Sequence, residues 1–67
     1  MPTGTIRKWI EDRGYGFIKP EDGGPDVFVH FRAFPRGLQV KEGMRVDFEV
    51  TNNAKTGKPQ ANNVRLL

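Results

Sequence analysis

Short segments of this chain alternate between apolar and polar residues, which is the pattern of a β-strand with one buried face. The clearest case is residues 44–51, where Val46, Phe48 and Val50 alternate with charged residues. No stretch keeps its apolar residues at the spacing of an amphipathic helix. The sequence therefore predicts an all-β fold, with strands over residues 4–10, 15–19, 26–31, 44–51 and 60–67.

Eight glycines and five prolines mark the connections between these strands. Residues 11–14 carry a turn signal, and residues 20–25 suit the tight connection of a hairpin. Residues 52–59 form a polar loop. The remaining connection, residues 32–42, is expected to be a loop with one short helical turn.

A chain of 67 residues holds one small domain, which we place over residues 1–67. It has no cysteine and one histidine, so it offers neither a disulfide nor a cluster of Cys and His ligands for a metal. Packing alone must stabilise such a small domain, and open sheet edges invite aggregation. These constraints favour a small closed barrel.

The direction of the side chains in the second and third strands decides what the sheet can bind. Because successive strand residues face opposite sides, one face of this hairpin is aromatic and the other is aliphatic. The barrel interior is expected to hold Ile6, Ile18, Val27, Val29, Val46, Phe48, Val50 and Val64, with Leu66 also inward. The rings left outside are Tyr15, Phe17, Phe28 and His30. An exposed aromatic patch of this size usually marks a binding site.

The opposite register would bury these rings and expose the valines of the third strand. It would enclose the Tyr15 phenol and the His30 imidazole, which need hydrogen-bond partners, and would leave Val27 and Val29 in water. The outward register is therefore favoured, and the buried one stays as the alternative.

The formal net charge of +3 is modest and fits an ordinary protein surface as well as a polyanion-binding one. The positions of the cations are more informative, because they are interleaved with the rings, at Arg7, Lys8, Arg13, Lys19 and Lys58. Aromatic platforms for bases, flanked by cations for phosphates, are typical of proteins that hold unpaired nucleic acids. A duplex hides its base faces, so the pattern favours single strands.

Two segments resemble the ribonucleoprotein motifs of cold-shock domains. RGYGFI, residues 13–18, fits the first motif with Ile as its last residue, and DVFVHF, residues 26–31, looks like the second. Gly4, the EG pair at 42–43 and PQANNV at 59–64 extend the resemblance over nearly the whole chain. It implies a five-stranded antiparallel OB-fold barrel that binds single-stranded RNA and DNA with low sequence specificity. Members of that family act as RNA chaperones and as regulators of transcription and translation.

The resemblance also implies roles for individual side chains. The stacking residues are expected to be Tyr15, Phe17, Phe28, His30 and Phe31, to which the distribution of aromatic residues adds Trp9 and Phe34. Arg7, Arg13, Asp26 and Gln60 are expected to be basic and polar contacts, to which the cations interleaved with the rings add Lys8 and Lys58. Among these, Asp26 and Gln60 are candidates for hydrogen bonds to base edges.

The sequence departs from the family pattern in two places. Family members usually have tryptophan and then phenylalanine in the first strand, where this chain has Lys8 and Trp9. Strict alternation would point Lys8 into the barrel, so a bulge or local twist is expected there. The loop of residues 34–40 is shorter than usual and lacks the customary aromatic residue, for which Phe34 or Leu38 is the candidate substitute.

An enzyme is the less fitting class, because the chain has no cysteine or serine and only one histidine to form a nucleophile–base pair. The carboxylate pairs at 11–12 and 21–22 lie at turns, where solvated side chains are the rule. We expect no cofactor, metal or small-molecule substrate. The stronger alternative is a small β-barrel interaction module whose aromatic face binds a peptide.

The first twelve residues are too polar for a secretion signal, and no stretch approaches the ~20 apolar residues of a membrane span. The expected protein is therefore soluble and cytoplasmic, without a membrane partner. Small barrels of this kind are commonly monomers, so a monomer is expected, with an exchanged or edge-paired dimer as the alternative.

Overall fold

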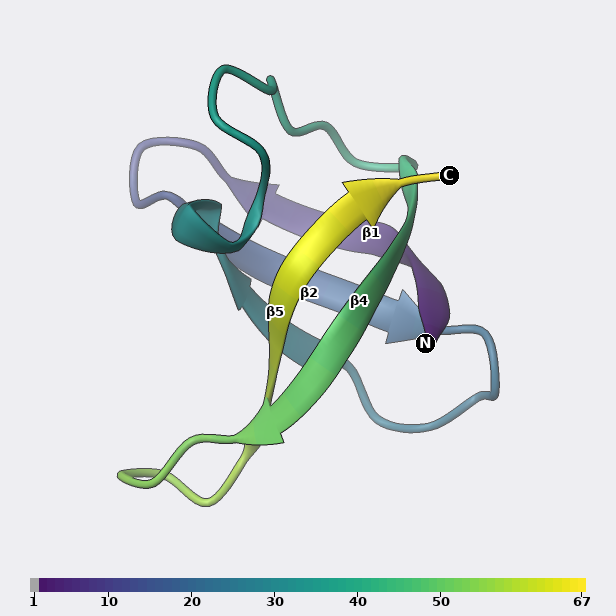
Figure 1. Cartoon of the computed structure of the whole chain (residues 1–67), viewed down its shortest axis with the longest axis vertical. Helices are drawn as coiled ribbons and strands as arrows, with labels where there is room; N and C mark the ends of the chain where they lie inside the picture. Colours follow the sequence, from purple (N-terminus) through teal and green to yellow (C-terminus); the bar gives the residue numbers. More distant parts are fainter. Residues whose placement is uncertain (1) are drawn as a thin grey trace.

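Five strands and one short helical turn make up the fold in the computed structural model, which describes residues 2–67 (Figure 1). The elements are β1 (Thr3–Ile10), β2 (Tyr15–Pro20), β3 (Val27–His30), the 3-10 turn η1 (Phe31–Ala33), β4 (Arg45–Asn52) and β5 (Pro59–Leu66). The predicted all-β class is confirmed. The expected helical turn is present, and it starts at Phe31, which the sequence pattern had assigned to the preceding strand.

The strands close into a barrel in the order β1-β2-β3-β5-β4. Four of the neighbouring pairs are antiparallel, whereas β3 and β5 run parallel. The predicted five-stranded barrel is confirmed, and only this junction departs from antiparallel pairing. The reason is topological: a closed ring with an odd number of strands cannot reverse direction at every step, so one pair must be parallel.

The predicted side-chain register of the β2–β3 hairpin is confirmed. Ile18, Val27 and Val29 are at most 4% exposed, and the rings of the two strands lie on the other side, partly in solvent. The buried core consists of Ile6, Ile18, Val27, Val29, Phe34, Val46, Phe48, Ala61 and Val64. Aliphatic side chains fill the barrel, so the aromatic face of the hairpin is free for another use.

A bulge in β1 lies directly before Lys8, one of the residues that depart from the family pattern. Ile6 pairs with Ile18 and Lys8 with Phe17, so Arg7 is the extra residue on β1. Lys8 is consequently exposed, together with Arg7, although strict alternation would have buried it. The bulge expected from the sequence is confirmed.

A second bulge lies in β5, and two of the expected core positions are exposed. Asp47 pairs with Arg65 and Glu49 with Asn62, which leaves one residue more on β5 than on β4. Asn63 lies in the bulge with a φ of 50°. The predicted inward residues Val50 and Leu66 pair with the buried Ala61 and Val46 and keep the predicted face, yet they are 43% and 48% exposed. Val50 lies beyond the part of β4 that pairs with β1, and Leu66 is the last residue of β5.

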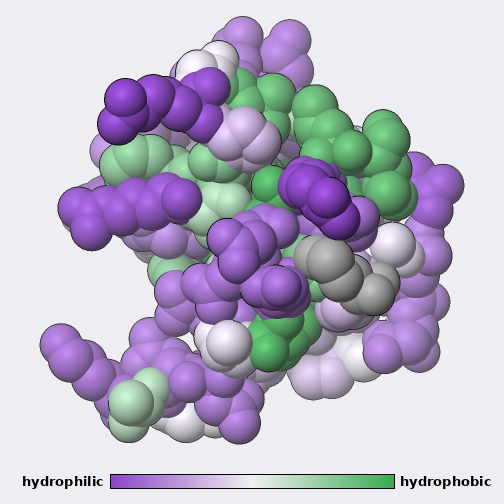
Figure 2. Space-filling model, viewed as in Figure 1, coloured by the Kyte–Doolittle hydropathy of each residue, from purple (hydrophilic) through white to green (hydrophobic). Residues whose placement is uncertain are grey.

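Polar side chains cover much of the face seen in Figure 2, and apolar surface gathers in its upper part. No helix within residues 2–67 has the length and apolar character needed to cross a membrane.

Candidate nucleic-acid interface

Three rings from β2 and β3 form a continuous cluster on the outside of the barrel. Phe17 lies opposite Phe28 in the strand pairing, and their ring centroids are 6.0 Å apart. Tyr15 lies 5.5 Å from Phe28 and 6.5 Å from Phe17. Each ring therefore contacts the other two while keeping part of its surface in solvent. We call Tyr15, Phe17 and Phe28 the ring cluster.

His30 and Phe31 extend this surface at the end of β3. Their ring centroids are 4.6 Å apart, and Phe31 is 53% exposed. The His30 Nδ1 accepts a hydrogen bond of 3.3 Å from the backbone N–H of Arg32, which orients the imidazole. Tyr15 pairs with His30 across the hairpin, so the two groups of rings adjoin.

Gly14 makes room for Phe31. Its φ is +73°, and a Cβ at this position would lie 2.8 Å from Cδ1 of the Phe31 ring. The Phe31 backbone N–H donates to the Gly14 carbonyl at 2.8 Å, which ties the turn to the end of β3. The glycine of the first motif thus lets the ring lie across the turn.

Trp9 is only partly exposed. Its indole packs edge-to-face on Phe34, with centroids 5.5 Å apart, and its backbone N–H donates to Glu42 Oε2 at 3.2 Å. A Cβ on Gly16 would lie 2.7 Å from Cε3 of Trp9 and 2.1 Å from the Lys8 carbonyl oxygen, so only glycine permits this packing.

Phe34 does not belong to the exposed rings. It is 7% exposed and lies in the core, because the η1 turn directs the chain back over the end of the barrel. The prediction that Phe34 presents its face to a base is wrong, because Phe34 is a core residue. Leu38, the other candidate for the missing loop aromatic, is partly buried and packs against the core.

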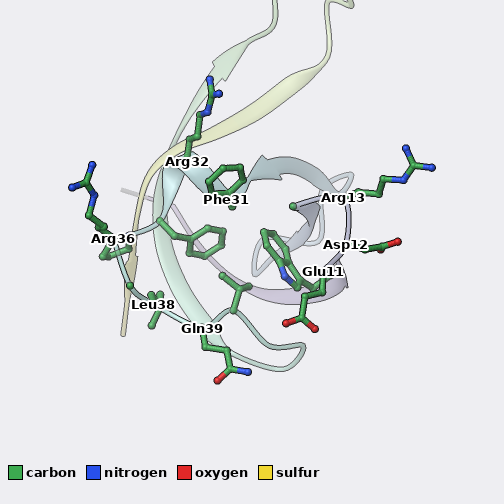
Figure 3. A pocket seen from close by; sticks show the side chains of 14 residues that line it. Glu11, Asp12, Arg13, Phe31, Arg32, Arg36, Leu38 and Gln39 are labelled. Atoms are coloured by element: carbon green, nitrogen blue, oxygen red, sulfur yellow. The ribbon is translucent and has the colours of Figure 1, made fainter.

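A groove of about 720 Å³ runs beside this end of the barrel (Figure 3). Its apolar wall includes Trp9, Phe31 and Leu38, and the edge of Phe34 also contributes. Arg13, Arg32 and Arg36 extend outward from its rim in different directions, as Figure 3 shows. Sequence reasoning missed Arg32 and Arg36. The signal for Arg32 is its position directly after the second motif, and Arg36 lies four residues further on.

The groove is mixed in charge. Glu11 and Asp12, at the β1–β2 turn, line it next to Arg13, so a phosphate would approach past Arg32 and Arg36 (Figure 3). The turn carboxylates are exposed, in agreement with the solvated role expected of them.

Arg7 and Asp26, both predicted contacts, form an ion pair of 2.7 Å between Nη1 and Oδ2. Their side chains are 65% and 29% exposed, so the pair is a surface one with little effect on stability. It partly neutralises Arg7, whereas Lys8, Arg13 and Lys58 are exposed cations around the rings.

Gln60 lies beside Phe28 on the neighbouring parallel strand. It lines a small hollow together with Phe17, Phe28 and Lys58, and its Oε1 accepts a hydrogen bond from Asn53. The predicted site residues thus fall mainly around two hollows: Trp9, Arg13 and Phe31 line the groove, and Phe17, Phe28, Lys58 and Gln60 line the small hollow. Within residues 2–67, no three His, Asp or Glu side chains form a group suited to hold a metal ion.

Comparison with known families fits this arrangement of rings and cations. The model of the "'Cold-shock' DNA-binding domain" family matches residues 2–67. The chain belongs to the cold-shock domain family. This is a family of nucleic-acid-binding proteins, and its predicted OB-type barrel is confirmed.

Relatives of similar length support the assignment. The chain is 51% identical over 66 residues to the cold shock-like protein CspE of Escherichia coli, covering 96% of this chain and 93% of the relative. It is 42% identical over 69 residues to the probable cold shock protein A of Mycobacterium tuberculosis, covering all of both chains. The same identity holds over 67 residues with the probable cold shock protein y4cH of Sinorhizobium fredii, covering 97% of each.

A solved structure described as drosophila Unr CSD456 has the same fold. The TM-score is 0.82 at 24% sequence identity, over 98% of this chain. This cold-shock domain spans about a quarter of that longer chain, 26% of its length.

Proposed function

We propose that this protein binds unpaired RNA or DNA on the outer face of β2 and β3, and that it acts as an RNA chaperone or regulator. The observation that carries the proposal is the direction of the side chains: the ring cluster, His30 and Phe31 face outward while Ile18, Val27 and Val29 fill the barrel. Packing of the barrel does not require the exposed faces of these rings.

Single strands suit this surface better than duplexes do. Each stacked base gains about 1–3 kcal/mol from an aromatic platform, and every base has a face to stack, so sequence hardly matters. Lys8, Arg13 and Lys58 lie around the rings and provide cations for the backbone. Because the whole surface belongs to one barrel, a single copy of the chain is sufficient for binding.

The same contacts account for a chaperone activity. A base that stacks on a protein ring cannot pair with another strand, so binding shifts the equilibrium from paired to unpaired RNA in proportion to the affinity for the unpaired form. No bond is made or broken, and the proposed role needs no catalytic group.

Binding is expected to weaken strongly with salt. If Lys8, Arg13 and Lys58 each neutralise one phosphate, log K should fall with log[salt] with a slope of about −2, which is about 20-fold between roughly 50 and 200 mM salt. Titration of oligo-dT or oligo-U, followed through quenching of the Trp9 fluorescence, measures this slope.

The salt dependence also separates nucleic acid from the rival ligand, a proline-rich peptide in the aromatic groove. A Lys8→Gln variant should reduce the slope by about 0.7, since one phosphate contact is lost. The proposal fails if the protein has no affinity for either oligonucleotide at low salt and binds a peptide with an affinity that salt leaves unchanged.

A further inference from the structure

A hollow of about 420 Å³ opens between the η1 turn and β5, on the side of the barrel where the parallel pair lies. The pairing of β3 with β5 is short, and β5 continues to Leu66 after β3 has ended at His30. We call this space the β5 hollow. Its lining consists of His30, Arg32, Ala33, Gln60, Asn62 and Asn63.

The β5 hollow continues the surface that carries the proposed site. Gln60 lines both the β5 hollow and the small hollow beside Phe17 and Phe28. His30, whose ring contacts Phe31, lines the β5 hollow as well. A nucleic-acid strand that leaves the rings at His30 can therefore cross the β3–β5 junction instead of following the groove.

The charges favour this path for a phosphate. Among residues 2–67, Arg32 is the one lysine or arginine that lines the β5 hollow, and no aspartate or glutamate lines it. Arg32 is exposed, and no carboxylate of the described chain forms an ion pair with it. Glu11 and Asp12, by contrast, line the groove. An anionic backbone therefore meets less repulsion in the β5 hollow than in the groove.

Two asparagines form the β5 wall of the hollow, and both are tied to β4. Asn63 Nδ2 donates to Glu49 Oε2 at 2.6 Å, and Asn62 Nδ2 donates to Thr51 Oγ1 at 2.6 Å. Asn63 lies in the β5 bulge with a φ of 50°, a feature that redirects side chains in a strand. These bonds hold the wall in place before a ligand arrives.

We propose that the β5 hollow holds one phosphate of a bound single strand against the Arg32 guanidinium, so that the strand site extends from the rings across the β3–β5 junction. The inference rests on the proposed function. A guanidinium presents its N–H donors in a planar fork that matches two oxygens of a phosphate. Such a contact carries no base information, so the extension adds affinity without selecting a sequence.

Two variants, one on each wall, test the site. Arg32→Gln should lower the affinity for oligo-dT about 5–10-fold at roughly 50 mM salt and reduce the salt slope by about 0.7, because one phosphate contact is lost. Asn62→Asp should lower the affinity by a similar factor, since a carboxylate there repels the phosphate or pairs with Arg32. The Thr51 hydroxyl can donate to the new carboxylate, so the shape of the wall is kept.

The double variant shows whether both positions act on the same phosphate. If they do, adding Asn62→Asp to the Arg32→Gln protein should change its affinity by less than about twofold, so the two effects are not additive. Arg36→Gln is the matched control, because Arg36 lines the groove and not the β5 hollow, and the two arginines extend in different directions (Figure 3). Its effect should add to that of Asn62→Asp.

A second control separates the site from a general charge effect. Asn52→Asp adds the same charge at an exposed position outside the β5 hollow, and it should change the affinity by less than about twofold. Circular dichroism confirms that each variant is folded before fluorescence anisotropy with labelled oligo-dT measures its affinity.

The outcomes separate the inference from the function on which it rests. The inference is overturned if Arg32→Gln binds like the wild type, if its effect and that of Asn62→Asp are additive, or if Asn52→Asp loses as much affinity as Asn62→Asp. Binding at the rings stands in each of these cases. A wild-type protein with no affinity for oligo-dT at low salt would refute the proposed function itself.

Discussion

Phe17→Ala and Phe28→Ala are each expected to lower the affinity for an unpaired hexanucleotide by at least about fivefold, because each removes a stacking platform worth about 1–3 kcal/mol. Both rings face outward from the sheet, so the variants should keep the barrel fold. Fluorescence anisotropy with labelled oligo-dT measures the affinity, and circular dichroism confirms the fold.

Leu66→Ala is the matched control, since Leu66 is an equally apolar residue that is 48% exposed on β5. It should leave the affinity unchanged. A folded Phe17→Ala or Phe28→Ala variant with wild-type affinity would show that the ring cluster does not contact the bases.

Phe48→Ala should destabilise the barrel by about 3–5 kcal/mol, since it empties the largest fully buried side-chain site of the core. Domains of this size have only a few kcal/mol of stability, so the variant should be largely unfolded at 37 °C. Val50→Ala, two residues further along the same strand, should change the free energy of unfolding by less than about 1 kcal/mol, because Val50 is 43% exposed.

Urea denaturation of both variants measures the difference. The pair tests how far the core extends along β4, because Val50 lies on the same face as Phe48 but outside the buried core. Similar losses of stability at the two positions would contradict the placement of Val50 on the surface.

Strand alternation was enough to predict the face that carries the proposed site. In β2 and β3 the pairing is regular, so the period of two residues places Phe17 and Phe28 outside and Val27 and Val29 inside, as the structure has them. The bulge in β1 was also predictable, because a lysine at an inward position signals a break in the alternation.

The errors occur near the ends of β4 and β5. Val50 and Leu66 lie opposite the buried Ala61 and Val46, so alternation gives their direction correctly, but it does not show that neighbouring strands fail to cover them. The bulge in β5 is a separate departure from the predicted strand. Asparagine tolerates a positive φ better than most residues, so Asn63 was the available signal for the bulge.

The turn after β3 accounts for the remaining differences between the predictions from the sequence and the structure. Its 3-10 geometry carries the chain over the end of the barrel, which buries Phe34 and brings Arg32 and Arg36 to the rim of the groove. A ring in a loop has no periodicity that reveals its direction, so sequence alone could not distinguish a core Phe34 from an exposed one. The Asn53–Gln60 hydrogen bond likewise depends on the folded shape of the β4–β5 loop.

The most direct test of the proposed interface is an NMR titration of the isotope-labelled protein with a short unpaired oligonucleotide. Signals of Tyr15, Phe17, Phe28, His30 and Phe31 should shift most, while those of Val50 and Leu66 should stay in place. Shifts confined to the opposite side of the barrel, or no shifts at a concentration of oligonucleotide well above that of the protein, would contradict binding at the β2–β3 face.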